Sequence, residues 1–330
     1  MQKPVTPTNL KTRFYKFIWR IFCSALFPLL RWLKSHGRLN RPINKIAQFW
    51  YDLPVDPVHY YSPLPDINKA RKNIARWRQA SQLPAVRMNL EGQLSFIKKL
   101  TPFSPECLTL PSFAQITEAG YGLGYGETEA HFLHCMIRYF KPRLIIEVGS
   151  GVSTMFSLHA LDMNARDSAQ AVAEMCCIEP YPTNKIEALA DARRITLHVK
   201  EVQDVPATVF ERLGGNDILF IDSTHAGKID SDVYYIYLEL LPRLKSGVVV
   251  HIHDICFPFL TCPPEHPVFA SSMLWNEGAL CQTFLAFNDA FEVLMCQSQL
   301  HYKQPSAMSD ILKVYNREQH FPSSLWLRRL

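Results

Sequence analysis

The sequence predicts a doubly wound α/β fold with a mostly parallel sheet that begins at residue 143, after an N-terminal helical and loop extension. Three observations predict it. From residue 143 onward, short apolar runs alternate with segments of helical spacing, which is typical of a parallel sheet covered on both faces. A glycine-rich turn joins the first apolar run to a helix. Hydrophobic residues make up 48% of the 330 residues, which allows a sizeable core.

The individual elements follow from these patterns. We expect strands at 143–148, 175–179, 194–198, 217–222, 247–252, 291–296 and 324–329. We expect helices at 68–82, 128–140, 152–163, 184–191, 205–213, 230–243 and 274–287, and irregular structure over 95–111. The strand after the fifth α/β repeat distinguishes the chain from an ordinary dinucleotide-binding fold.

Three regions are predicted along the chain: a basic amphipathic extension (1–50), a helical and loop cap segment (51–142) and the α/β domain (143–330). Residues 1–51 hold ten Lys or Arg and no Asp or Glu, whereas the rest of the chain holds 25 basic and 30 acidic residues. Because the body is net acidic, we expect no nucleic-acid partner for it. Nine cysteines without metal-site spacing indicate reduced core residues.

Residues 14–33 are aromatic and basic, and two interpretations stay open for them. The uninterrupted apolar run Ile21 to Leu30 is too short to cross a bilayer. Trp19 and Trp32 among basic residues fit a helix that lies on an anionic membrane surface. The alternative is a helix that packs on the enzyme body or on a second subunit of a homo-oligomer. A cytoplasmic protein is expected, at the inner face of the membrane in the first case.

The first strand and its turn read LIIEVGSGVST (144–154) and predict a nucleotide-binding corner. Glu147 ends the strand, and Gly149, Ser150 and Gly151 turn the chain. Glycines permit a close approach of the backbone to a ligand. The following helix presents unpaired N–H groups and the positive end of its dipole.

Three further acidic or amide side chains are candidates for cofactor contacts. Glu179 ends the second strand, where an acid can accept hydrogen bonds from ribose hydroxyls. Gln203 and Asp204 follow the third strand, where an adenine amine would lie. A solvated acid and an ordinary polar loop are the structural alternatives for these positions.

Polar residues also follow the fourth and fifth strands. Asp222, Ser223 and His225 follow the fourth strand, and His253 and Asp254 follow the fifth. The carboxyl ends of neighbouring parallel strands converge on the ligand crevice. Asp222, His253 and Asp254 could bind Mg²⁺ or Mn²⁺. His225 is expected to have a pKa near the working pH and to accept a substrate proton.

Two other segments bear on the site. His251 shares a face with His253, and the pattern favours a hydrogen-bonded core histidine at this position. The stretch HYYSPLPD contains His59, Tyr60 and Tyr61, and together with the loop 257–267 it is predicted to contact the substrate. Both stretches are rich in proline and aromatic residues that could cover the crevice.

These residues resemble the class I S-adenosylmethionine-dependent methyltransferases. EVGSGVST (147–154) looks like their first motif, and Glu179 matches their ribose-binding acid. Longer stretches, among them NDILFIDSTH (216–225) and GVVVHIHDICFPF (247–259), resemble an uncharacterised bacterial branch. The resemblance covers roughly residues 55–330, and its motifs are long enough to be specific.

The resemblance implies a seven-stranded sheet of order 3-2-1-4-5-7-6 with S-adenosylmethionine as cofactor, bound in part by Glu147, Ser223 and Asp222. Asp222 and Asp254 match acids that hold Mg²⁺ in the metal-dependent O-methyltransferases of this class, but His253 departs from their pattern. The spacing of Asp222 and His225 resembles sugar O-methyltransferases in which the histidine is the base.

The predicted function is therefore S-adenosylmethionine-dependent O-methylation of a small or saccharide-like hydroxyl compound by direct displacement, with catalytic residues Asp222, His225 and His253. An NAD(P)-linked oxidoreductase is one alternative, but Thr154 replaces the third glycine that it would need. A catalytically silent cofactor-binding or scaffold protein is another. The complete set of glycines and strand-end acids disfavours it.

Overall fold

A computed structural model describes residues 18–22, 24, 26, 28, 65–122, 124–167, 173–261 and 275–330. The chain divides into two compact units, residues 1–74 and 75–330. In the first unit the described residues between 18 and 28 are helical, and α3 covers Ile67–Lys72. None of the described helices is both long and apolar enough to cross a membrane.

The predicted helix over 68–82 is wrong in its second half. A short helix, α4, covers Ile74–Trp77 and ends there. Beyond it, the backbone N–H of Ser81 donates to the carbonyl of Pro258 at 2.7 Å, and the Ser81 hydroxyl accepts from the N–H of Leu83 at 3.0 Å. These contacts draw the backbone out of the helical pattern, because its donors pair elsewhere.

The second unit is built on one seven-stranded sheet of order β3-β2-β1-β4-β5-β7-β6, so the order implied by the resemblance is confirmed. The first five strands pair in parallel, and β7 is antiparallel to both β5 and β6. The strands are β1 (Leu144–Val148), β2 (Glu174–Ile178), β3 (Thr196–His198), β4 (Ile218–Ile221), β5 (Val249–Ile252), β6 (Phe291–Cys296) and β7 (Leu325–Arg329).

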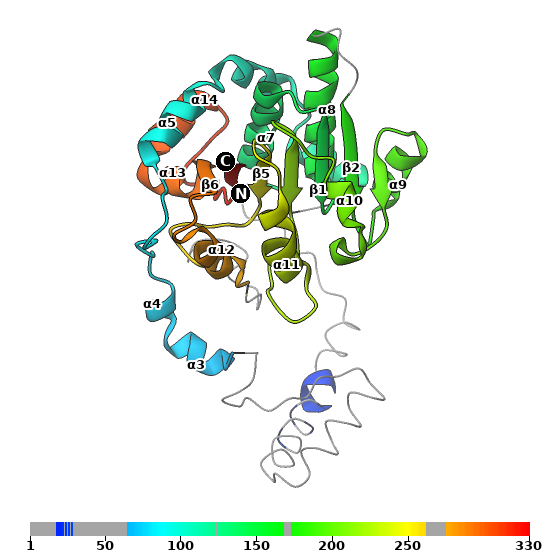
Figure 1. Ribbon diagram of the computed structural model, residues 1–330. Coiled ribbons are helices and arrows are strands. Elements are labelled where there is room, and N and C mark those ends of the chain that lie inside the picture. Colours follow the sequence, from blue (N-terminus) through cyan, green and yellow to red (C-terminus); the bar gives the residue numbers. More distant parts are fainter. Residues whose placement is uncertain are drawn as a thin grey trace. The chain divides into compact units, whose positions relative to one another are not determined.

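Helices cover both faces of this sheet (Figure 1). They are α7 (Glu127–Phe140), α8 (Val152–Asp167), α9 (Asn184–Asp191), α10 (Ala207–Phe210), α11 (Asp232–Tyr235) with η4 (Ile236–Leu240) and η5 (Leu241–Arg243), and α12 (Glu277–Leu285). Each lies within a predicted helical segment or extends it by a few residues. The predicted helix 230–243 is built from α11, η4 and η5 in succession.

The sequence analysis missed several short elements. Residues 95–111 were expected to be irregular, but α5 (Leu90–Lys98) occupies their start and η1 (Thr101–Thr109) is a 3₁₀ helix. Two further helices, α13 (Gln297–Lys303) and α14 (Pro305–Ile311), lie beside α5 and β6 in Figure 1. The remaining missed elements are α6 (Phe113–Ile116), η2 (Thr117–Tyr121) and η3 (Val202–Asp204).

The core lies on both faces of the sheet, which explains why the strands read as continuous apolar runs. On β1, Ile145 packs into one buried cluster and Ile146 into the other. Helix α7 packs against α8 in the first cluster, with Phe132 and Ile137 fully buried. A helix that precedes the α/β repeats thus belongs to the same core.

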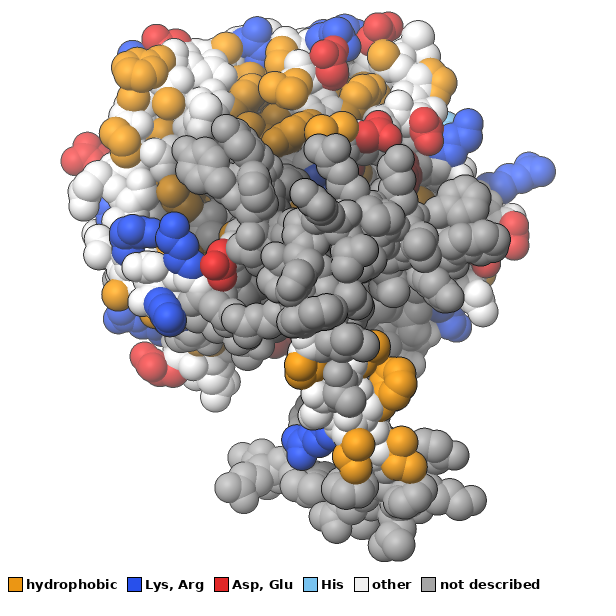
Figure 2. All heavy atoms as spheres, turned by 90° about the horizontal axis from the view of Figure 1, so that it is seen from below, with side chains coloured by type: hydrophobic (Ala, Val, Ile, Leu, Met, Phe, Trp, Pro, Cys, Tyr) orange, Lys and Arg blue, Asp and Glu red, His pale blue; other side chains and the backbone are white. Residues whose placement is uncertain are grey.

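The surface of the second unit carries both charge signs. On the face shown in Figure 2, described Lys and Arg side chains are interspersed with Asp and Glu side chains.

Candidate active site

Gly149 forms the corner between β1 and α8. Its φ angle is +93°, a conformation that side chains rarely adopt. A Cβ atom there would lie 2.6 Å from the carbonyl oxygen of Asp222. The backbone N–H of Asp222 in turn donates to the carbonyl of Val148 at 2.9 Å. The glycine corner and the end of β4 therefore abut directly, as the convergence of strand ends predicts.

The buried side chain of Glu147 stabilises this corner. Its buried carboxylate accepts hydrogen bonds from the hydroxyls of Ser153 at 2.5 Å and Thr154 at 2.6 Å, both in the first turn of α8. The Thr154 hydroxyl also accepts from the N–H of Gly151 at 2.9 Å. Burial raises the pKa of Glu147 to about 7, against the opposing effect of these hydroxyls. The carboxylate thus fixes the turn from within the core.

Two buried hydroxyls lie at the ends of β1 and β4. The Oγ atoms of Ser150 and Ser223 are shielded from solvent, and neither has a hydrogen-bond partner among the described residues. Buried polar groups in proteins are nearly always satisfied. A polar ligand between these strand ends would satisfy both, so the residues at this corner fit a nucleotide cofactor such as S-adenosylmethionine.

Glu179 lies directly after β2, and its Oε1 atom accepts from the N–H of Tyr181 at 2.8 Å. The Glu179 side chain is half-buried, and its Oε2 atom does not take part in that hydrogen bond. Gln203 and Asp204 are in η3; the Gln203 amide donates to Glu201 at 2.5 Å and to the carbonyl of Asp230 at 3.3 Å. These hydrogen bonds hold the Gln203 side chain against the neighbouring loop.

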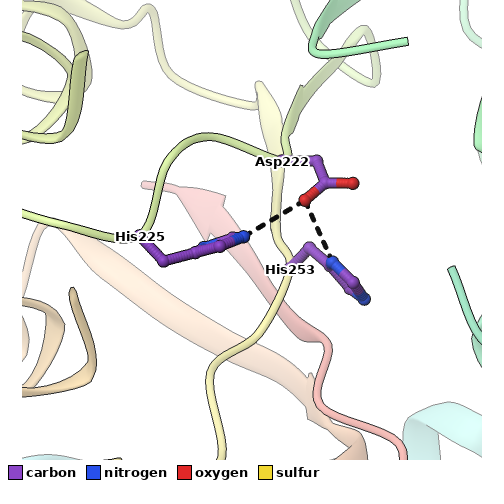
Figure 3. A group of neighbouring side chains, drawn as sticks. All are labelled: Asp222, His225 and His253. Carbon is purple, nitrogen blue, oxygen red and sulfur yellow. Dashed lines mark hydrogen bonds and ion pairs between the residues drawn. The ribbon is translucent and has the colours of Figure 1, made fainter. Parts of the chain in front are cut away.

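The predicted strand-end cluster assembles around Asp222 (Figure 3). Its Oδ1 atom lies 3.1 Å from Nδ1 of His253 and 3.3 Å from Nε2 of His225. One donor atom from each of these residues lies within 4.8 Å of the others, a spacing suited to a metal ion. His225 and His253 are nearly fully buried.

Asp254 completes the cluster. Its Oδ2 atom lies 3.5 Å from Nε2 of His225 and 3.6 Å from Nδ1 of His253, and its Oδ1 atom accepts from the Ser323 hydroxyl at 2.8 Å. Asp254 and His225 have φ angles of +55° and +57°. Left-handed backbone is uncommon outside glycine, and such strain is concentrated at functional sites.

Two buried glutamates that the sequence analysis missed lie behind the histidines. Glu277, at the start of α12, has Oε2 2.8 Å from Nδ1 of His225. Glu129, in the first turn of α7, has Oε1 3.2 Å from Nε2 of His253. Each histidine therefore faces Asp222 with one ring nitrogen and a glutamate with the other.

The carboxylates control the charge of the histidines. Burial lowers the pKa of His225, but Asp222, Glu277 and Asp254 outweigh it and raise the pKa to about 10. The expectation of a pKa near the working pH is therefore wrong. Burial likewise opposes a charge on His253, but its acidic neighbours raise its pKa well above the ordinary value. The surrounding carboxylates therefore favour the cationic form of both imidazoles.

A glycine-rich segment that the sequence analysis passed over lies beside the corner. Gly120, Gly122 and Gly124 have positive φ angles, and a Cβ on Gly151 would lie 2.8 Å from the carbonyl oxygen of Tyr121. Further along, the Tyr125 ring centroid is 4.9 Å from that of His253. The repeated glycines of GYGLGYG (120–126) were the signal that could have predicted this close approach.

The remaining predicted residues divide into two groups. His251 is a core histidine: it is fully buried, shares a hydrogen bond with Ser324 at 2.8 Å, and burial lowers its pKa to about 3. His59, Tyr60 and Tyr61 lie outside the described residues, and the loop 257–267 is described only as far as residue 261. Their substrate role stays a prediction.

Part of the α/β region is similar to a known protein family. Residues 146–255, from β1 to just beyond β5, match the model of a family described as a methyltransferase domain. Over this stretch, one third of the chain, the α/β region is similar to that family. An uncharacterized protein of Archaeoglobus fulgidus is 28% identical over 185 residues, which cover 49% of this chain and 75% of that protein.

Distant likeness to solved structures was also found. The O-methyltransferase TomG from Streptomyces achromogenes, in complex with SAM, is 15% identical with a TM-score of 0.40, over 74% of this chain and 91% of that one. The O-methyltransferase from Bacillus cereus, in complex with SAH, is 12% identical with a TM-score of 0.41, over 71% and 100%. These likenesses are too remote to assign a function.

Proposed function

We propose that the chain is an S-adenosylmethionine-dependent O-methyltransferase that acts on a small or saccharide-like hydroxyl compound. The observation that carries the proposal is the direct contact between the corner at Gly149 and the end of β4 at Asp222. A cofactor bound at the corner would have its reactive end beside the Asp222, His225 and His253 cluster. The methyltransferase match over residues 146–255 supports the same reading.

The reaction would be a direct displacement. A bond forms between the acceptor oxygen and the methyl carbon while the methyl–sulfur bond breaks, and its electron pair stays on the sulfur of S-adenosylhomocysteine. The hydroxyl proton would pass to the neutral form of His225, which a cation bound by Asp222 and Asp254 would favour, because it would offset the carboxylate charge that raises the pKa of His225. Asp222 and Glu277 would then stabilise the imidazolium that results, since both lie within 3.3 Å of its ring nitrogens. Holding donor and acceptor in line supplies much of the acceleration.

Metal assistance is part of this proposal, with Asp222, His253 and Asp254 as the ligands. Nδ1 of His253 lies 3.1 Å from Oδ1 of Asp222 and 3.6 Å from Oδ2 of Asp254. Ligand atoms bound to one ion at about 2.1 Å, at angles near 90 to 110°, have separations of about this size. A bound divalent ion would lower the pKa of the acceptor hydroxyl and stabilise the negative charge that develops on its oxygen.

Calorimetry tests the cofactor assignment without knowledge of the acceptor. The full chain is titrated with S-adenosylmethionine, S-adenosylhomocysteine and NAD. We expect the first two to bind and NAD not to bind. Binding of NAD alone would favour the oxidoreductase, and no binding of S-adenosylmethionine would overturn the proposal. A panel of saccharides and phenols, with release of S-adenosylhomocysteine as the readout, then tests the acceptor class.

We also propose that the N-terminal segment contacts an anionic membrane surface. Among its described residues, the side chains of Trp19 and Phe22 are 66% and 51% exposed, and their rings stack with centroids 5.6 Å apart. Exposed aromatic rings within a strongly basic segment suit a helix at a lipid interface. Trp19→Glu combined with Phe22→Glu should reduce flotation with phosphatidylglycerol vesicles. Unchanged flotation would favour the alternative of packing on protein.

A further inference from the structure

His253 is the residue at which this site differs from a site of oxygen ligands alone. It follows β5, where the resemblance implies an acid, and it presents a ring nitrogen to Asp222 at 3.1 Å. Mg²⁺ and Mn²⁺ prefer oxygen ligands, whereas imidazole suits ions such as Fe²⁺, Ni²⁺ and Zn²⁺, and a given site usually binds Co²⁺ more tightly than Mn²⁺. A histidine at this position therefore changes which ions the site favours.

The surroundings of His253 match those of a metal-binding histidine. Such a histidine usually has its second ring nitrogen on a carboxylate, which fixes the ring and increases its basicity. Here Oε1 of Glu129 lies 3.2 Å from Nε2 of His253, so Nδ1 faces Asp222. The ring therefore lies between two carboxylates.

Glu129 itself is held firmly in place. Its Oε1 atom accepts from the N–H of Ser323 at 2.9 Å and the Ser324 hydroxyl at 3.1 Å, and it lies 3.2 Å from the Ser323 hydroxyl, which donates to Asp254. Its Oε2 atom accepts from the N–H of Gly126 at 3.2 Å. Glu129 is buried in α7, outside the α/β repeats. These hydrogen bonds fix the Glu129 carboxylate, which can therefore orient the His253 ring.

We propose that Asp222, His253 and Asp254 form a mixed nitrogen and oxygen site that takes a borderline divalent ion in preference to Mg²⁺, and that Glu129 is the positioning residue that orients His253. This inference rests on the proposed function only for the use of the ion. His225, whose Nε2 lies 3.3 Å from Asp222, stays beside the ion as the proton acceptor. The other buried glutamate, Glu277, supports His225 and not the ligand.

The experiment compares cobalt and magnesium binding by the full chain. Calorimetry with CoCl₂ and MgCl₂ gives the two dissociation constants, and the visible absorption of bound Co²⁺ reports nitrogen coordination. We expect Co²⁺ to bind at least about tenfold more tightly than Mg²⁺. His253→Asp should lower this ratio by about tenfold or more, because it restores an oxygen ligand. An unchanged ratio, or no metal binding by the wild type, would overturn the proposal.

A matched pair of variants tests the positioning role. Glu129→Gln should weaken Co²⁺ binding by about 10- to 100-fold. Glu277→Gln removes the same charge from behind the other histidine and should weaken it by less than about tenfold. The reverse order would make His225 the ligand and refute the assignment. If Glu129→Gln lowers the urea midpoint of unfolding, the metal-site assignment is tested by the Co²⁺ spectrum of His253→Asp alone. A spectrum identical to that of the wild type would refute the assignment.

The exposed Glu292 on β6 supplies an inert control, since Glu292→Gln leaves the site untouched. Titration with S-adenosylmethionine in the absence of metal separates the two claims. Cofactor binding without metal selectivity would overturn only the assignment of the metal site. Metal selectivity without cofactor binding defeats only the proposed function.

Discussion

Replacing Glu147 by glutamine should change how the stability of the protein depends on pH. Burial raises the pKa of this carboxyl from 4.5 to about 7. The folded chain therefore holds the proton more tightly than the unfolded chain does. For an acid with a raised pKa, stability is greatest below the unfolded pKa and is lost as the pH rises through the folded pKa.

The size of the effect follows from the separation of the two pKa values. The free energy of unfolding changes between pH 4.5 and about pH 7, the two pKa values of Glu147. At about 1.4 kcal/mol per pH unit, the total change over this range is about 3 kcal/mol. Glu147→Gln carries no such titration. The stability of the variant relative to the wild type should thus improve by about 3 kcal/mol between pH 4.5 and pH 8, whatever the starting difference from altered bonds to Ser153 and Thr154.

Urea unfolding followed by tryptophan fluorescence at pH 4.5, 6, 7 and 8 measures this difference. Glu292→Gln is the control, because that side chain is exposed and should show no comparable trend. A stability difference between Glu147→Gln and wild type that does not change with pH would refute the reasoning. Calorimetry on the same variant adds a functional reading: a loss of cofactor affinity without unfolding would show that Glu147 matters to the bound ligand as well as to the turn.

Three further substitutions have expected outcomes. Gly149→Ala should lower S-adenosylmethionine affinity by calorimetry at least about tenfold, because the added Cβ would lie 2.6 Å from the Asp222 carbonyl oxygen. Glu179→Ala should weaken the same binding by about tenfold through loss of a charged acceptor, with an unchanged melting temperature. Asp217→Asn should cost about 1–3 kcal/mol in urea unfolding, since one carboxylate caps the N–H groups of Arg143, Leu144 and Gly214.

The sheet could be predicted well because its signal is local. Each strand is an apolar run buried on both faces, and Ile145 and Ile146 alternate between the two core clusters as the pattern requires. The short helices α13 and α14 lack that kind of signal. Their buried residues, such as Gln297 and Leu300, do not form a clear amphipathic period. Local propensity without periodicity is a weak guide.

The strand-end cluster could be predicted because parallel topology alone brings Asp222 and His253 together. The charge state of His225 could not be predicted, because it depends on Glu277, which lies 52 residues further along the chain. Helix α12 places that carboxylate beside the ring, and the N–H groups of Asn276 and Glu277 approach the carbonyl of His225 at 3.1 and 3.3 Å. No spacing in the sequence indicates such an attachment.

The contact of Glu129 with His253 could not be predicted from the sequence either. Strands and helices therefore have different roles in building the site. Residues at strand ends are fixed in position by the sheet, but a histidine ring still rotates about its side-chain bonds. The rotation is fixed by groups from other elements, here α7 and α12, whose carboxylates hold the outer nitrogens of His253 and His225. The sheet therefore determines which groups meet, while the surrounding helices determine which atom each histidine presents to Asp222. Substitutions at Glu129 and Glu277 therefore test the orientation of the two rings directly, because the residues at the strand ends stay unchanged.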